Sequence, residues 1–168
     1  DGQYALSGGS DGTIRLWDII SRTEIKRLKA HTGSLGVWYV SFSRDGKYIL
    51  SGGNDRLLKL WEVSSGAEIR RFSAFSGSTP SLLSDGVGYA ALSPDGKNII
   101  SVATDAAVRI YNASTGEEMA VLIGFMDGEW LAITSEGYYN SSAKGAEYLN
   151  VKFEGKDYLS HLQECVVP

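Results

Sequence analysis

Residues 49–62 read ILSGGNDRLLKLWE, and nearly the same order of residue types stands at residues 5–18 (ALSGGSDGTIRLWD) and 99–112 (IISVATDAAVRIYN). An Asp-Gly pair precedes each copy, at positions 1–2, 45–46 and 95–96, so the repeat has a period of 44 and then 50 residues. Such a period is typical of four-stranded β-propeller blades and not of short helical or leucine-rich repeats. The repeat itself therefore predicts the fold.

Short strands separated by turn residues fill each repeat and leave no room for helices. In the second repeat, strands are expected at residues 37–43, 48–52, 57–63 and 68–72, with turns rich in Asp, Asn and Gly between them. These residues tolerate the positive φ values and the side-chain-to-backbone hydrogen bonds that tight hairpins require. Alternation of apolar and polar residues along each strand determines the buried face. Four strands and three tight turns make one blade.

The remaining repeats follow the same scheme with gaps. Strands are expected at residues 4–8, 13–17 and 24–28 in the first repeat, and at 88–93, 98–102, 107–111 and 118–123 in the third. A fourth, divergent unit is expected from strands at 128–134, 137–141 and 148–153. Residues 158–162 are expected to form either a last strand, which is favoured, or a short helix.

The predicted fold class is all-β: a partial propeller of about four four-stranded antiparallel blades, the first and last incomplete or divergent. We expect one propeller region over residues 1–155, with a C-terminal tail or closing strand over 156–168. The expected blades are residues 1–30, 31–74, 75–124 and 125–155. We do not expect about four blades to close a ring. We therefore expect this chain to be the C-terminal part of a larger propeller.

Composition excludes several function classes. The chain of 168 residues has 16 Lys and Arg against 20 Asp and Glu, and its net charge of -4 argues against nucleic acid or an anionic membrane as the main partner. No apolar run approaches the roughly 20 residues of a membrane span. The N-terminal residues also lack the basic-then-apolar order of a signal peptide, which favours a cytoplasmic location.

Cysteine, metal and nucleotide chemistry have little support in the sequence. Cys165 is the only cysteine, so no internal disulfide and no paired-cysteine metal site is predicted. No phosphate-binding loop, HExxH or EF-hand pattern is present, and we expect neither a cofactor nor a metal. His161 and Cys165 lack the glycine-flanked motifs of caspase-type enzymes, so a free thiol is the favoured interpretation of Cys165.

Three residues recur at matching positions of the first two repeats: Ser7, Asp11 and Trp17 correspond to Ser51, Asp55 and Trp61. Trp17 and Asp18 form a Trp-Asp dipeptide, and at this point the chain resembles the WD40-repeat β-propellers. The resemblance implies a buried hydrogen-bond network joining a His before the first strand, a Ser or Thr on the second, an Asp in the next turn and a Trp on the third. In the second repeat these residues are His31, Ser51, Asp55 and Trp61.

A network of this kind makes physical sense because an indole N–H, a hydroxyl, an imidazole and a carboxylate each cost free energy when buried without partners. A Ser, His and Asp also suggest a hydrolytic triad. We reject that alternative because Ser51 stands in mid-strand, outside any G-x-S-x-G turn, and its pattern repeats at Ser7 and Ser101. A structural role is therefore predicted for all three serines.

The third repeat departs from this pattern. It keeps Ser101 and Asp105, has Tyr111 in place of the Trp, and offers no His near residues 75–76. We therefore expect an incomplete network in this blade. It follows that Asp105→Ala should cost less stability than Asp55→Ala.

Residues 127–142, DGEWLAITSEGYYNSS, resemble a segment at the end of propellers in many bacterial WD-repeat proteins, some of which carry a caspase-type peptidase domain elsewhere. The favoured interpretation of Trp130, Tyr138 and Tyr139 is that they fill the core of a degenerate last blade.

The sequence favours a non-enzymatic scaffold that binds other proteins, or further blades of the same propeller, through loops on its surface. The expected contact residues lie in turns: Arg44, Lys47, Arg56 and Lys97. The alternative is a sensory or regulatory module of a larger bacterial enzyme, linked to a caspase-type peptidase. An intrinsic hydrolase would need an exposed, activated nucleophile, which the sequence does not offer. Open blade edges also predict self-association.

Overall fold

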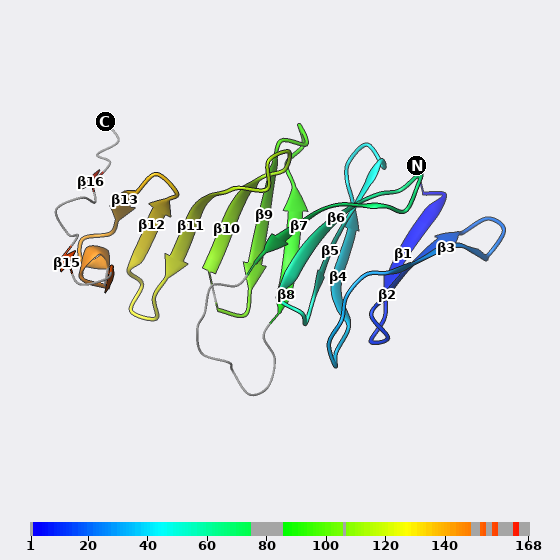
Figure 1. The fold of residues 1–168 in the computed structure, drawn as a ribbon, viewed down its shortest axis with the longest axis horizontal. Helices are drawn as coiled ribbons and strands as arrows, with labels where there is room; N and C mark the ends of the chain where they lie inside the picture. The colour runs from blue at the N-terminus through cyan, green and yellow to red at the C-terminus, as the bar shows by residue number, and fades with distance from the viewer. Residues whose placement is uncertain are drawn as a thin grey trace.

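The computed structural model describes residues 2–74, 86–105 and 107–148, together with the short segments 152–153, 156–157 and 163–164. Within these residues the chain consists of β-strands, turns and one short 3₁₀ helix, so the predicted all-β fold class is confirmed. Three antiparallel sheets follow one another along the long axis of the molecule, from the N-terminal sheet to the C-terminal one (Figure 1).

The first two sheets follow the repeats directly. The first sheet has the order β1 (Tyr4–Gly8), β2 (Thr13–Asp18) and β3 (Thr23–Lys29). The second sheet has the order β4 (Val37–Phe42), β5 (Tyr48–Gly53), β6 (Leu57–Glu62) and β7 (Glu68–Ser73). Every neighbouring pair is an antiparallel hairpin, and these strands begin and end within two residues of the predicted bounds.

The third sheet is larger than one repeat. Its antiparallel strands are β8 (Val87–Leu92), β9 (Asn98–Ala103), β10 (Ala107–Asn112), β11 (Glu118–Gly124), β12 (Trp130–Thr134) and β13 (Tyr138–Ser141), in that order. The two-residue strand β16 (Gln163–Glu164) pairs in parallel with β13. The 3₁₀ helix η1 (Gly145–Tyr148) follows β13, and β14 (Lys152–Phe153) pairs with β15 (Lys156–Asp157).

A shared turn structure explains why strands begin after the Asp-Gly pairs. The hydroxyl of Ser43 donates to Asp45 (2.7 Å), and Asp45 accepts the backbone N–H of Lys47 (3.1 Å). The same two bonds join Ser93, Asp95 and Lys97 at 2.6 and 3.1 Å. These bonds lower the pKa of both carboxyl groups, with the serine hydroxyl as the main cause. The turn is therefore encoded by a few adjacent residues.

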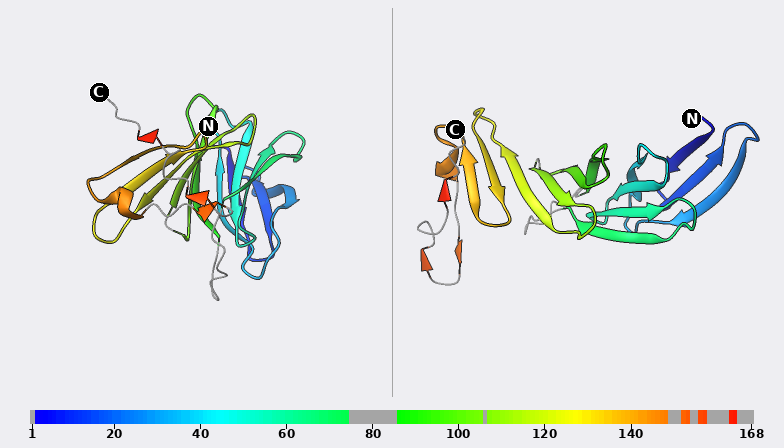
Figure 2. Two further views of the ribbon diagram at one scale, coloured as in Figure 1. Left: turned by 60° about the vertical axis from the view of Figure 1, so that its left-hand side comes forward. Right: turned by 90° about the horizontal axis from the view of Figure 1, so that it is seen from above.

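The second sheet packs one face on the first sheet and the opposite face on the third. On every sheet, the face on the side of the preceding sheet is here called the near face, and the face on the side of the following sheet is called the distal face. The core between the first and second sheets includes Ile14, with Ile49 and Trp61 from the near face of the second sheet. The core between the second and third sheets joins distal-face and near-face residues: Leu50, Leu58 and Leu60 against Ile99 and Tyr111. The views in Figure 2 show the sheets following one another in this order.

The structure corrects the expected fourth blade at residues 125–155. β12 pairs with β11 in one ladder, so β12 and β13 extend the third sheet instead of forming a sheet of their own. Residues 125–129 close a tight hairpin, in which the N–H of Phe125 donates to the carbonyl of Glu129 (2.8 Å). By contrast, residues 30–36 connect β3, the last strand of the first sheet, to β4, the first strand of the second sheet. The shorter turn leaves β12 beside β11.

Two further expectations concern the C-terminal part. Of the strand expected at residues 148–153, Tyr148 instead ends the helix η1 and Lys152–Phe153 is a strand, while residues 149–151 lie outside the described residues. The strand expected at residues 158–162, and with it His161 and Cys165, lies outside the described residues. So do the connection at residues 75–85 and Asp1.

Candidate functional site

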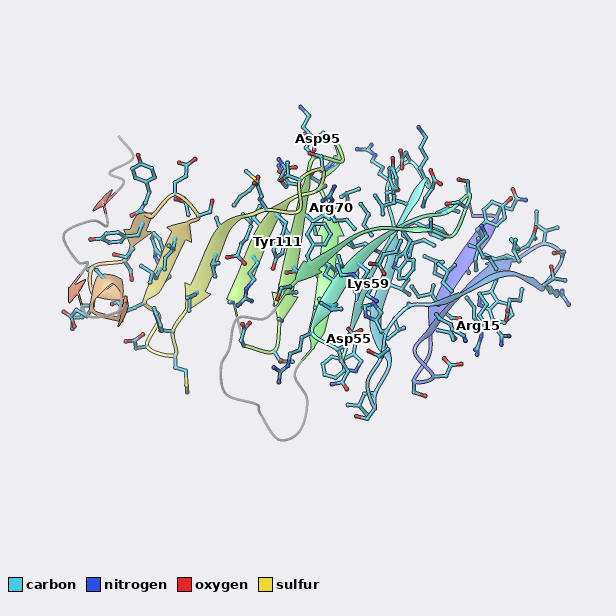
Figure 3. All side chains as sticks on the ribbon, viewed as in Figure 1. Arg15, Asp55, Lys59, Arg70, Asp95 and Tyr111 are labelled. Atoms are coloured by element: carbon cyan, nitrogen blue, oxygen red, sulfur yellow. The ribbon has the colours of Figure 1, made fainter. Side chains whose placement is uncertain are left out.

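The four residues expected to form a network in the second sheet lie within hydrogen-bond distance of one another. The Trp61 indole N–H donates to Ser51 Oγ (2.9 Å), and Ser51 Oγ lies 2.8 Å from His31 Nε2. His31 Nδ1 lies 2.8 Å from Asp55 Oδ1. The residues come from β6, β5, the β3–β4 connection and the β5–β6 turn, and His31, Ser51 and Trp61 are buried. Figure 3 marks Asp55 at one end of the strands.

The direction of these hydrogen bonds follows from their chemistry. Burial lowers the pKa of His31, although the hydrogen bond and charge of Asp55 oppose that shift, so the imidazole is neutral. The ionised carboxylate only accepts, so Nδ1 carries the proton, and Nε2 accepts the hydroxyl of Ser51. Both ring nitrogens and the hydroxyl are thus engaged inside the protein, and Ser51 is 0% exposed, so its hydroxyl is out of reach of a substrate.

The first sheet contains only part of this network. The Trp17 indole N–H donates to Ser7 Oγ at 2.9 Å. Asp11, however, binds Arg15, with 2.6 Å between Oδ2 and Nη2, and accepts the hydroxyl of Thr13 at 2.7 Å. Hydrogen bonds from Thr13 lower the pKa of Asp11. The aspartate therefore pairs with an arginine in its own hairpin.

The third sheet arranges the same positions differently. Ser101 Oγ is fully buried and makes no hydrogen bond of ordinary geometry within the described part of the chain, although a weak contact with the Tyr111 hydroxyl acts to lower the pKa of Tyr111. The Tyr111 hydroxyl reaches the carbonyl of Ser73 in the second sheet (3.0 Å), and burial raises the pKa of Tyr111 to about 12. Asp105 forms a two-pronged ion pair with Arg109, which is only 2% exposed. Ser101 is therefore outside the hydrogen-bond network of the third sheet, whereas Asp105 has a charged partner.

The electrostatics of this pair explain its protonation. Burial alone raises the pKa of Asp105, but hydrogen bonds from Arg109 and from the backbone N–H of Ala107 outweigh burial and lower it. For Arg109, burial acts to lower the pKa, and Asp105 more than compensates. Both groups are therefore charged. The sequence-based expectation that Asp105 matters less than Asp55 overlooked this buried ion pair.

A row of cations at matching positions was missed by the sequence reasoning. Each sheet has a cation two residues before the aromatic residue of the same strand: Arg15 on β2, Lys59 on β6 and Arg109 on β10. Each cation lies 3.6 Å from a glutamate on the next strand. Two of these cations also bind the residue that follows the last strand of the preceding sheet. Lys59 Nζ donates to the carbonyl of Ala30 (2.5 Å), and Arg109 Nη1 donates to the carbonyl of Ala74 (3.3 Å). Alignment of IRLW, LKLW and VRIY would have shown this repeat.

The four expected contact residues do not lie at one end of the sheets. Arg44 and Lys47 are exposed in the β4–β5 turn, and Lys97 is exposed in the β8–β9 turn at the same end. Arg56 lies in the β5–β6 turn, at the opposite end, with a φ of 64°. Figure 3 shows the two ends through the labelled residues Asp95 and Asp55. The β4–β5 and β8–β9 turns thus define one surface, and Arg56 lies outside it.

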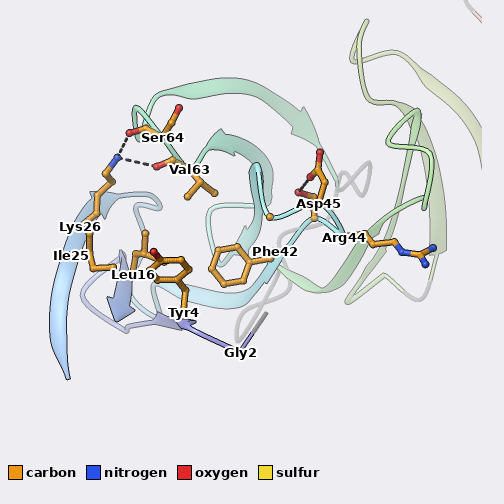
Figure 4. Close-up of a pocket in the computed structure, with 12 residues that line it drawn as sticks. Gly2, Tyr4, Leu16, Ile25, Lys26, Phe42, Arg44, Asp45, Val63 and Ser64 are labelled. Atoms are coloured by element: carbon orange, nitrogen blue, oxygen red, sulfur yellow. Dashed lines mark hydrogen bonds between the residues drawn. The ribbon is translucent and has the colours of Figure 1, made fainter. Parts of the chain in front are cut away.

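Two neighbouring pockets open at the end that carries Arg44. The larger, of about 760 Å³, lies between the first and second sheets (Figure 4). Its floor is apolar and includes Tyr4, Leu16, Ile25, Phe42 and Val63. The smaller, of about 320 Å³, lies between the β4–β5 and β8–β9 turns. Residues 43–45 border both pockets, so the turn with Arg44 is the wall between them.

The Lys26 side chain fixes the far wall of the larger pocket. Its ammonium donates to the carbonyls of Val63 (2.9 Å) and Ser64 (2.6 Å), which ties β3 to the β6–β7 turn. Figure 4 shows these two bonds across from Arg44 and Asp45. Arg44 is thus the cation at this pocket that projects into solvent, because Lys26 is engaged with backbone carbonyls.

Successive antiparallel sheets packed face to face, with a Trp–Ser–His–Asp chain between them, define a partial β-propeller. A family model described as WD domain, G-beta repeat matches residues 1–18 and 22–62, so this part of the chain consists of WD40-type repeats. The comparison with curated proteins gave no match. Within the described residues there is no cluster of metal-ligating side chains and no helix long and apolar enough to cross a membrane.

Proposed function

We propose that this chain is a non-enzymatic scaffold that binds protein partners at the surface formed by the β4–β5 and β8–β9 turns. WD40 repeats generally serve as platforms for protein interaction. The observation that carries the proposal is the pair of pockets that share the wall around Arg44. An apolar pocket with a few polar groups at its rim is the usual form of a recognition site.

The non-enzymatic part of the proposal is supported by how the reactive side chains are used. Both nitrogens of His31 are bonded within the protein, and the hydroxyls of Ser7 and Ser51 accept indole N–H groups. General acid or base catalysis requires such a group within reach of a substrate. These groups stabilise the sheets instead.

The surface favours a partner segment with apolar side chains and an acidic residue. The apolar floor can take aromatic or aliphatic side chains, and Arg44 at the rim can pair with a carboxylate in two-pronged geometry. Lys47 and Lys97 lie in the same two turns, where Asp45 and Asp95 offset their positive charge. A rim charge such as that of Arg44 mainly increases the association rate and the specificity.

The test is a selection of binders from a displayed peptide library on the chain, followed by titration of the selected peptides. Arg44→Glu should weaken their binding by about tenfold or more, because it replaces an attractive contact with a repulsive one. Arg56→Glu, the same change at the opposite end, should leave binding unchanged. Equal effects of the two substitutions, or none from Arg44→Glu, would reject this surface.

A further inference from the structure

The distal face of the third sheet is apolar and uncovered within the described residues. Ile100 and Ile110 pair across β9 and β10, Val108 pairs with Leu122 across β10 and β11, and all four point to the same side. Ile100 is 41% and Leu122 39% exposed, and the other two are half-buried. A contiguous apolar surface of this kind marks an interaction site.

The other two sheets show what this face is built to contact. The residues that match Ile100, Val108 and Ile110 are Leu50, Leu58 and Leu60 in the second sheet, and Leu6, Ile14 and Leu16 in the first. Leu58 and Ile14 are 0% exposed because the next sheet covers them. The described residues therefore contain two completed copies of an interface and the apolar half of a third, which no described segment covers.

The complementary half is present at the other end of the same chain. The near face of the first sheet carries Ala5, Ser7 and Trp17, at the positions of Ile49, Ser51 and Trp61. Ile19, which follows β2, matches Val63 and Ala113, both of which pack in the inter-sheet cores. Ile19 is 49% exposed and Trp17 half-buried. The near face of the first sheet therefore carries residue types similar to those on the near faces of the second and third sheets.

We propose that a second copy of this chain packs the near face of its first sheet on the distal face of the third sheet. The contact repeats the sheet-on-sheet packing that the chain already contains twice, with Trp17 and Ile19 against Ile100, Val108 and Ile110. It joins two different faces, so association is head-to-tail and gives a closed ring or an extended array. The sequence already predicts self-association of an open array, through its uncovered blade faces as well as its strand edges, and the structure points to the faces.

The test uses charge substitutions on one face at a time, with the mass in solution measured by light scattering across a wide concentration range. Ile100→Lys (distal face) and Ile19→Lys (near face) should each weaken self-association by about tenfold or more, because each buries a charge without a partner. The matched controls are Ile69→Lys, at a site 44% exposed on β7, and Ile20→Lys, at a site 78% exposed beside Ile19. Neither control should change the mass.

Mixing separates head-to-tail from symmetric contact. A mixture of Ile100→Lys and Ile19→Lys chains retains one intact face of each kind, so it should form dimers that neither variant forms alone. Wild-type chain that stays monomeric throughout the range would overturn the proposal, and so would a mixture that forms no dimers. Arg44→Glu should leave the mass unchanged, so this result is independent of the peptide-binding test.

Discussion

The second and third sheets share a backbone register but satisfy the same aspartate in different ways. In the second, Asp55 accepts from the imidazole of His31, which continues through Ser51 to Trp61. In the third, Asp105 holds the buried guanidinium of Arg109, and the serine hydroxyl makes no hydrogen bond of ordinary geometry within the described residues. A repeat position can therefore keep its residue type while the residues around it change its partner.

The comparison also shows that an aspartate in a repeat without the histidine still has a charged hydrogen-bonding partner. In the third sheet Arg109 takes the place of the histidine and pairs with Asp105, and in the first sheet Arg15 pairs with Asp11 in the same way. In the second sheet, where His31 is present, Lys59 turns to the carbonyl of Ala30 instead. The carboxylate has a hydrogen-bonding partner in all three sheets.

The largest expected effect is the loss of Asp105. Asp105→Ala leaves Arg109 charged and buried without its main partner, so we expect it to lower the free energy of unfolding by about 3 to 5 kcal/mol. Asp55→Ala should cost about 1 to 3 kcal/mol, because the groups left behind are neutral. Urea denaturation measures both.

A double variant tests the cause. Asp105→Ala combined with Arg109→Met removes both charges and should recover most of the loss, because an apolar pair can replace a buried ion pair. A smaller cost for Asp105→Ala than for Asp55→Ala would restore the sequence-based order and contradict the ion-pair explanation.

An intermediate effect is expected from pH. Burial lowers the pKa of His31 from its ordinary value of 6.5, so the unfolded chain takes up this proton before the folded chain does. The free energy of unfolding should therefore fall as the pH falls below about 6.5. His31→Gln should lose this part of the pH dependence, while His161 is common to both chains. Parallel pH profiles of the two chains would show that His31 is protonated equally well in the folded state.

The smallest effect separates two serines at matching positions. Ser51→Ala removes an acceptor of the Trp61 indole and a donor to His31, so it should cost about 1 to 3 kcal/mol. Ser101→Ala removes a buried hydroxyl that makes no hydrogen bond of ordinary geometry to any described residue, so its effect should stay within about 0.5 kcal/mol or be stabilising. Thermal or urea unfolding of both variants gives the comparison. Equal losses would mean that Ser101 has a partner of similar strength.

Much of the fold could be read from the sequence because its determinants are local. The hydrogen bonds of the two Asp-Gly turns join residues at most five positions apart, from Ser43 to Tyr48 and from Ser93 to Asn98. The strand bounds of the repeats therefore follow from neighbouring residues in the sequence. The set His31, Ser51, Asp55 and Trp61 was also accessible, because the same residue types recur at the same spacing. Local chemistry thus determined the hairpins and nominated the polar positions.

Tertiary structure decided which groups those positions meet. The pairing of β12 with β11, the burial of Arg109 beneath the Ala74 carbonyl, and the separation of Arg56 from Arg44 depend on segments far apart in the chain. The exposure of Ile100 beside the burial of the matching Leu50 depends on whether a following sheet packs there. A repeat prescribes the same strand wherever it occurs, but burial and partners arise from packing across sheets, which the residues of one repeat do not contain.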